Sequence, residues 1–138
     1  MSQYIPDILR KLVAERANFR CEYCCLPDQK SFFTFHIDHV VSLKHGGETT
    51  ADNLAYACSI CNVNKGSDVA TFLEDRTKSV RFFNPRLDNW YGHFVVEPSG
   101  LLTALTDIGA ATLKILQLNH PDSVIERREL IRLGLLNL

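Results

Sequence analysis

The chain lacks several features that would narrow its class at once. It has no hydrophobic run of membrane-spanning length, and its first residues, Met1 to Asp7, contain no apolar stretch typical of a secretory signal. We therefore expect a cytoplasmic protein with no membrane partner. An excess of one charge is also absent, since 15 Lys and Arg face 16 Asp and Glu, for a net charge of -1. Any binding of nucleic acid must then come from a local patch.

Internal repeats and low-complexity segments are absent too. A chain of 138 residues suffices for one domain with an appendage. The first half alone would bury little apolar surface, and a structural metal is a common remedy for a small domain.

What the chain does have is cysteine in a distinctive arrangement. Four of its five cysteines form two CxxC pairs, Cys21/Cys24 and Cys58/Cys61. Such pairs in a chain without an export signal favour metal over disulfides. Four thiolates close the tetrahedral shell of Zn²⁺, so we expect a structural zinc site; the alternative is a chance grouping of buried thiols. Cys25 is then a bystander or, by a slip of register, a ligand.

A second set of polar residues lies between the two pairs. Asp38 and Asn62 each offer an oxygen to a hard cation such as Mg²⁺, which keeps several waters. His39 could accept a proton from an attacking water, because its unperturbed pKa lies near 6.5. Adjacent strand residues point to opposite faces, so the strand must bend or end near Asp38-His39 if both serve one site.

The pattern around these residues predicts a helix over about 5–18, whose apolar stripe packs in the core, and a strand over 31–41. Gly46-Gly47 then opens a loop, and residues 54–57 form a second strand. Ser59 should cap a helix that carries Asn62 and Lys65 on one face, with a continuation from Ser67 to Leu73. The expected order is strand, loop, strand, helix.

After residue 78 the pattern changes. We expect a strand over 90–96, a turn at residues 98–100, a returning strand over 101–105, and helices over 108–116 and from 124 to a stop at Gly134. The predicted fold class is α+β. Its domains are residues 1–78, with the zinc site, and residues 79–138, a hairpin with two helices.

From Cys21 to about Lys65 the sequence resembles the HNH (ββα-metal) endonuclease family. The resemblance rests on the zinc pairs, on Asp38-His39, on Asn53 in the middle position and on Asn62, an Asn in the third position. It implies a ββα-metal fold in which His39 is the general base and Asp38 and Asn62 hold a catalytic Mg²⁺ or Mn²⁺. It also implies that Asn53 pins the loop and orients the His39 backbone, that Lys65 lies near the phosphates, and that the products carry a 5′-phosphate and a 3′-hydroxyl.

Basic residues follow this motif. Arg76, Lys78 and Arg81, with Phe82 and Phe83 behind them, suit a face that tracks phosphates, although a solvated linker has the same composition. His36 is a further candidate for substrate contact, even though strand alternation places it on the face opposite His39.

We therefore expect a metal-dependent DNA endonuclease, a hydrolase acting on phosphodiester bonds, as a monomer or a homodimer. One alternative is a catalytically silent, zinc-stapled module that binds nucleic acid. Another is a structural zinc domain that docks a partner protein through its C-terminal helices.

Overall fold

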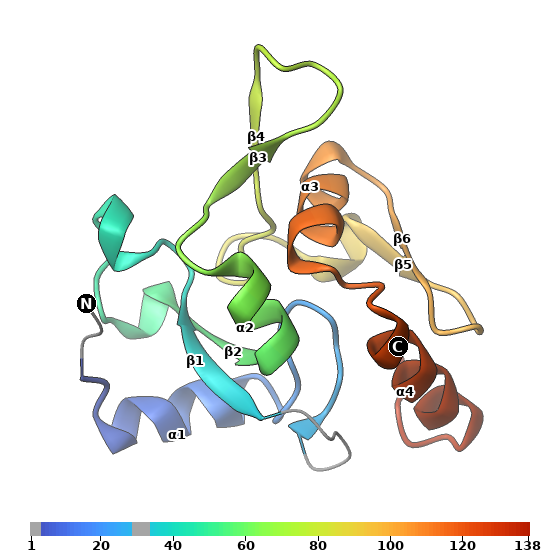
Figure 1. Ribbon diagram of the computed structural model, residues 1–138. Helices are drawn as coiled ribbons and strands as arrows, with labels where there is room; N and C mark the ends of the chain where they lie inside the picture. Colours follow the sequence, from blue (N-terminus) through green and yellow to red (C-terminus); the bar gives the residue numbers. More distant parts are fainter. Residues whose placement is uncertain (1–3, 29–33) are drawn as a thin grey trace. The chain divides into compact units, whose positions relative to one another are not determined.

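The computed structural model describes residues 4–28 and 34–138. Within these residues the fold is mixed α and β, with four helices and three two-stranded antiparallel sheets. Contacts divide the chain into two compact units, residues 1–69 and 70–138 (Figure 1). The predicted domain boundary after residue 78 stays a prediction, because a compact unit is defined by contacts and a domain by whether it folds alone. No helix among the described residues is long and apolar enough to cross a membrane.

The first unit is built on a hairpin with a helix on each face. Strands β1 (Phe35–His39) and β2 (Leu54–Cys58) pair antiparallel, with His39 opposite Leu54. Ile37 packs on the core that α1 (Asp7–Arg16) forms with β2. The next residue, Asp38, contacts Lys65 of α2 (Ser59–Lys65), so α1 and α2 cover opposite faces. The predicted strand 31–41 is confirmed over β1, and its residues 31–33 lie outside the described part.

Helix α1 begins after Pro6 and carries Asp7 in its first turn, where a negative charge favours the helix dipole. It ends where Asn18 and Phe19 adopt left-handed conformations, with φ of 55° and 57°. The expectation that its apolar stripe packs in the core holds for part of the stripe, since Ile5 and Val13 belong to the core and Leu9 packs against it. Val13 is buried, but Ile8 is 79% exposed and Leu12 42%. The stripe is therefore wider than the face that β2 covers.

Helix α2 differs from its prediction at both ends. Its N-cap is Cys58 rather than Ser59, because the Cys58 sulfur accepts the hydrogen bond from the backbone N–H of Cys61. The helix stops at Gly66, with φ 52° and ψ -129°. The predicted continuation from Ser67 to Leu73 is wrong, since Ala70–Phe72 forms strand β3 and pairs with β4 (Ser79–Arg81). A cross-strand partner has overridden the local helical pattern.

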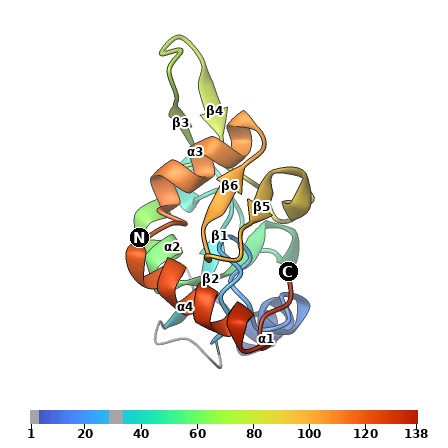
Figure 2. The same cartoon turned by 90° about the vertical axis from the view of Figure 1, so that its right-hand side faces the viewer.

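The second unit contains the β3–β4 hairpin, a second hairpin and two helices. Strands β5 (Phe94–Val96) and β6 (Leu102–Ala104) are the predicted pair, although the first is shorter because residues 90–92 form a 3₁₀ turn. Helices α3 (Asp107–Leu116) and α4 (Pro121–Arg132) are the predicted helices. Helix α3 lies against both hairpins (Figure 2). Its buried face packs in the core of this unit, to which the rings of Phe82, Phe83 and Phe94 belong.

A buried arginine holds the end of this unit together. Arg127 of α4 is 0% exposed, and its guanidinium donates to the carbonyls of Gly100 (2.6 Å) and Leu118 (3.0 Å). These carbonyls belong to the β5–β6 turn and to the α3–α4 connection. Arg127 therefore binds three consecutive parts of the chain to one another.

Replacing Arg127 with Met should lower the free energy of unfolding of this unit by about 3 kcal/mol, because two buried carbonyls lose a charged donor. Urea unfolding followed by the fluorescence of Trp90, the single tryptophan of the chain, measures this. Arg128→Met is the control: Arg128 is exposed on the same helix and should change stability by no more than about 0.5 kcal/mol. Equal effects of the two substitutions would contradict the role of Arg127.

Candidate functional site

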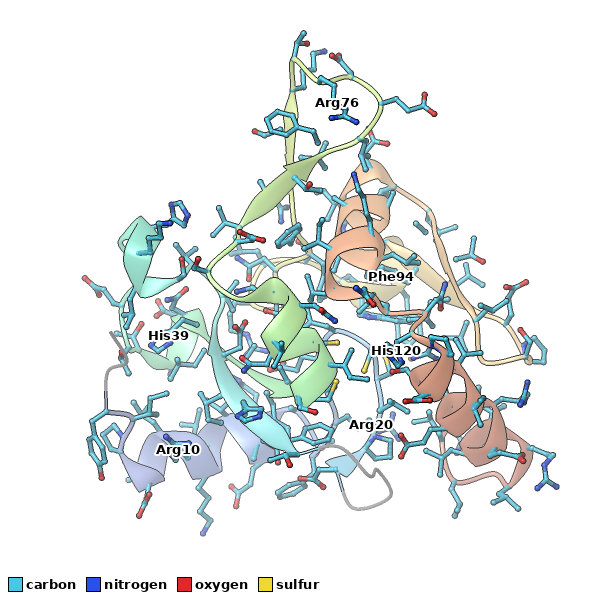
Figure 3. The ribbon with its side chains drawn as sticks, viewed as in Figure 1. Arg10, Arg20, His39, Arg76, Phe94 and His120 are labelled. Atoms are coloured by element: carbon cyan, nitrogen blue, oxygen red, sulfur yellow. The ribbon has the colours of Figure 1, made fainter. Side chains whose placement is uncertain are left out.

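Two centres are built into the first unit, and the cysteine cluster is the more rigid. Cys21, Cys24, Cys58 and Cys61 are all buried, and their sulfur atoms lie within 4.8 Å of one another. The Cys24 and Cys58 sulfurs are 3.6 Å apart. Zinc–sulfur bonds of about 2.3 Å in a tetrahedron put sulfurs about 3.8 Å apart, so the cluster fits Zn²⁺. Figure 3 shows the sulfur atoms gathered beside α2.

Each CxxC turn also donates a backbone N–H to its own first sulfur. The N–H of Cys24 lies 3.4 Å from the sulfur of Cys21, and the N–H of Cys61 lies 3.5 Å from the sulfur of Cys58. Such donors favour the thiolate form that metal binding requires. The cluster thus has the composition, burial and geometry of a structural zinc site that ties the turn after α1 to the start of α2. Cys25 lies outside the cluster.

The second centre is organised around the Asp38 carboxylate, which is 4% exposed. Its Oδ1 accepts a hydrogen bond from the Lys65 ammonium at 3.2 Å, and its Oδ2 accepts one from the Tyr23 hydroxyl at 2.7 Å. Burial raises the pKa of Asp38, while Lys65 and Tyr23 oppose that rise by favouring the charged form. A cation bound nearby would act in the same direction as Lys65.

Lys65 of α2 points into the domain. Its side chain is 1% exposed, and its ammonium also donates to the backbone carbonyl of His39 at 2.8 Å. Lys65 therefore joins the side chain of Asp38 to the backbone of the next residue. Its predicted contact with phosphate stays a prediction, and in this conformation its charge is already paired.

His39 lies at the end of β1 and is partly buried. Its Nε2 is 2.9 Å from the hydroxyl of Thr49, in the loop that joins the two strands. Burial lowers the pKa of His39, although the charge of Asp38 partly opposes this. The ring is therefore neutral at neutral pH, which is the form that can accept a proton.

Asn53 closes the loop between β1 and β2. Its Oδ1 accepts from the N–H of Val41 at 2.9 Å, and its Nδ2 donates to the carbonyls of Val41 (3.0 Å) and Glu48 (2.8 Å). A Cβ on Gly47 would lie 1.7 Å from the carbonyl oxygen of Val41, so only glycine fits next to the hydrogen bonds that Asn53 makes. The structure thus places Asn53 where it pins the loop that follows His39.

An open pocket of about 720 Å³ brings the predicted site residues together. Asp38, His39 and Asn62 all line it, and so does His36 in spite of the alternation along β1. Asn62 comes from α2 and the other three from β1, so the pocket lies where strand and helix meet. A carboxylate and an amide oxygen in one pocket are a donor set that Mg²⁺ or Mn²⁺ accepts.

Sequence reasoning missed three residues at this site. Arg10 and Lys44 line the same pocket, and both are exposed cations; Figure 3 labels Arg10 on α1. Arg10 and Lys44 are far apart in the sequence, so no sequence pattern indicated that they share this pocket. Tyr23 is fully buried and binds Asp38, and its place inside a CxxC turn was the only available clue.

The predicted basic patch belongs to the second unit. Arg81 forms an ion pair with Asp88 through two hydrogen bonds, of 2.8 and 2.9 Å. Arg76 and Lys78 are exposed between β3 and β4, where Figure 3 labels Arg76. The aromatic residues of this stretch, Phe82 and Phe83, are buried and therefore offer no surface on which a base could stack.

A comparison with known families decides the nature of the first unit. Residues 21–68, about a third of the chain, match the family model of the HNH endonucleases. The chain carries an HNH endonuclease domain. The matched range contains the four-cysteine cluster and every residue of the second centre described above except Arg10 of α1. No curated protein and no solved structure matches the chain.

The resemblance seen in the sequence is therefore confirmed. The HNH domain supports nuclease chemistry on nucleic acid in general, and the cysteine cluster is consistent with a zinc-stapled HNH domain. The roles of individual residues in catalysis stay predictions.

Cys61→Ser should remove bound zinc and unfold the HNH domain. Structural zinc contributes about 10–16 kcal/mol in zinc-binding peptides, more than a small domain has to spare. Metal analysis and circular dichroism of the purified protein measure both effects. Cys25→Ser is the matched control, since Cys25 is outside the cluster and should keep zinc in equimolar amount. Zinc retained in Cys61→Ser would contradict the four-cysteine assignment.

Lys65→Met should lower the free energy of unfolding by roughly 3–5 kcal/mol, because it leaves the buried carboxylate of Asp38 without its cation. Thermal unfolding in the absence of DNA measures this. Lys44→Met, at an exposed lysine that lines the pocket, should have little effect. A Lys65→Met protein that is as stable as the unchanged protein but binds DNA more weakly would contradict this structural role. It would support the contact between Lys65 and phosphate that the sequence predicts.

Proposed function

We propose that the protein is a metal-dependent DNA endonuclease that hydrolyses phosphodiester bonds and leaves a 5′-phosphate and a 3′-hydroxyl. The observation that carries this proposal is the pocket of the HNH domain. There a buried carboxylate, a neutral imidazole and a helix-borne amide share one opening. This set serves hydrolysis of a phosphodiester better than it serves binding alone.

His39 is the general base in this proposal. Thr49 engages its Nε2, so Nδ1 is the ring nitrogen that accepts a proton from the attacking water. Asn53 holds the loop that carries Thr49 and thereby fixes the orientation of the ring. Asn53 does this through Val41 and Glu48 and touches no reacting atom itself.

Asp38 and Asn62 would hold the catalytic Mg²⁺ or Mn²⁺, because they supply the hard oxygen donors of the pocket. Such an ion supplies Lewis-acid stabilisation of the charge that develops on the leaving 3′ oxygen. Lys65 acts on the site through its bonds to Asp38 and to the backbone of His39. It keeps the carboxylate charged and directed at the pocket before the ion binds.

DNA is held in this proposal by exposed cations rather than by net charge. Arg10 and Lys44 line the pocket itself, and His36 lines it as a further polar contact. Arg76 and Lys78 offer further charges in the second unit, whereas Arg81 is already paired with Asp88. Contacts of this kind position the phosphate backbone without reading the bases, so they predict little dependence on sequence.

The test is cleavage of supercoiled plasmid in the presence of Mg²⁺ or Mn²⁺. We expect nicking or linearisation, and a rate that falls about 10²-fold or more in His39→Ala, the scale of a lost general base. His120→Ala is the control, because His120 caps α4 in the second unit and should leave the rate unchanged.

Other outcomes have distinct meanings. Binding of the plasmid without cleavage, indifferent to His39, would show a silent zinc-stapled module that binds nucleic acid. No binding at low salt would leave a structural zinc domain that docks a protein.

A further inference from the structure

Tyr23 connects the two centres of the HNH domain. It lies between the zinc-site residues Cys21 and Cys24, it is fully buried, and its hydroxyl donates to Oδ2 of Asp38 at 2.7 Å. The turn from Cys21 to Cys24 thus offers two sulfurs to the cysteine cluster and one hydroxyl to the Asp38 carboxylate of the second centre. Nothing in the roles proposed so far uses this hydroxyl.

The turn that carries Tyr23 has little freedom to move. Besides its two sulfurs, it is held by backbone bonds from Cys21 N–H to the carbonyl of Leu26 (2.8 Å) and from Glu22 N–H to the carbonyl of Tyr56 (2.8 Å). The second of these bonds ties the turn to β2. The position of the Tyr23 hydroxyl is therefore fixed by the zinc site and by the hairpin together.

Asp38 receives one donor on each carboxylate oxygen, and the two donors come from different elements. Lys65 reaches Oδ1 from α2, and Tyr23 reaches Oδ2 from the zinc-site turn. One donor alone would let the carboxylate turn about its last bond. Two donors at separate oxygens set its plane and so determine which lone pairs face the pocket.

We propose that Tyr23 is a positioning residue through which the zinc-site turn orients Asp38 toward the catalytic divalent cation. This inference rests on the proposed function of the same pocket. Loss of a group that hydrogen-bonds to a metal ligand typically lowers the affinity for the metal by about 10–100-fold. Zinc would thus support catalysis by placing a hydroxyl as well as by holding the fold.

Tyr23→Phe tests the proposal, because it removes only the hydroxyl and keeps the buried ring. Tyr56→Phe is the matched control: its hydroxyl also donates to a carboxylate, that of Asp28, at 2.6 Å. The dissociation constant for Mn²⁺ is measured by electron paramagnetic resonance of the free ion in the full-length zinc-loaded protein. Zinc content and the dependence of plasmid nicking on Mn²⁺ concentration are measured beside it.

We expect the dissociation constant for Mn²⁺ to rise about 10-fold or more in Tyr23→Phe and to stay unchanged in Tyr56→Phe. Both variants should retain equimolar zinc. Nicking by Tyr23→Phe should recover toward the unchanged protein's rate at high Mn²⁺, a recovery that general loss of structure would not produce.

Three results would overturn the inference. Equal Mn²⁺ affinity of Tyr23→Phe and the unchanged protein would show that Lys65 alone suffices. Loss of zinc from Tyr23→Phe would show that the hydroxyl serves the zinc turn instead. An unchanged protein that neither binds Mn²⁺ nor nicks DNA would overturn the proposed function as well, whereas the first two results leave that function standing.

Discussion

The contact between the Asp38 carboxylate and its two donors is the polar interaction that links the parts of the HNH domain to one another. A carboxylate that is 4% exposed is costly to keep charged, and a partner on each oxygen offsets that cost. The donors arrive from α2 and from the turn after α1, so both segments must be in place before Asp38 is satisfied. One carboxylate thereby couples α2 and the turn after α1 to β1.

The cysteine cluster complements this contact by holding the same two segments, α2 and the turn after α1. Two of its sulfurs precede and start α2, and two flank Tyr23. A domain of this size has a small apolar core, in which Ile5, Val13 and Leu54 form a buried cluster. Metal and ion pair therefore supply much of what a larger core would supply. The same rigidity suits a site whose groups must stay aligned.

Much of this arrangement was predictable from the sequence, because its signals are local. The spacing of the cysteines, the run Asp38-His39 and the positions of Asn53 and Asn62 identified the family and the order strand, loop, strand, helix. The prediction was wrong where a contact with a residue distant in the sequence determines the local structure. The helix expected after Ser67 is replaced by the β3–β4 pairing, and Cys58 rather than Ser59 caps α2 because its sulfur faces the other cysteines. The inward turn of Lys65 depends on a carboxylate 27 residues away.

The loop between β1 and β2 has one further consequence, for how such a domain can diversify. Asn53 anchors Val41 and Glu48, and the carbonyl of Ser42 accepts the N–H of Gly47. Residues 43–46 thus form a small closed excursion whose base is fixed independently of its content. Leu43 and Lys44 of this excursion line the pocket. Evolution can therefore exchange or lengthen these few residues, and so retune which substrates enter, without disturbing the groups that perform the chemistry.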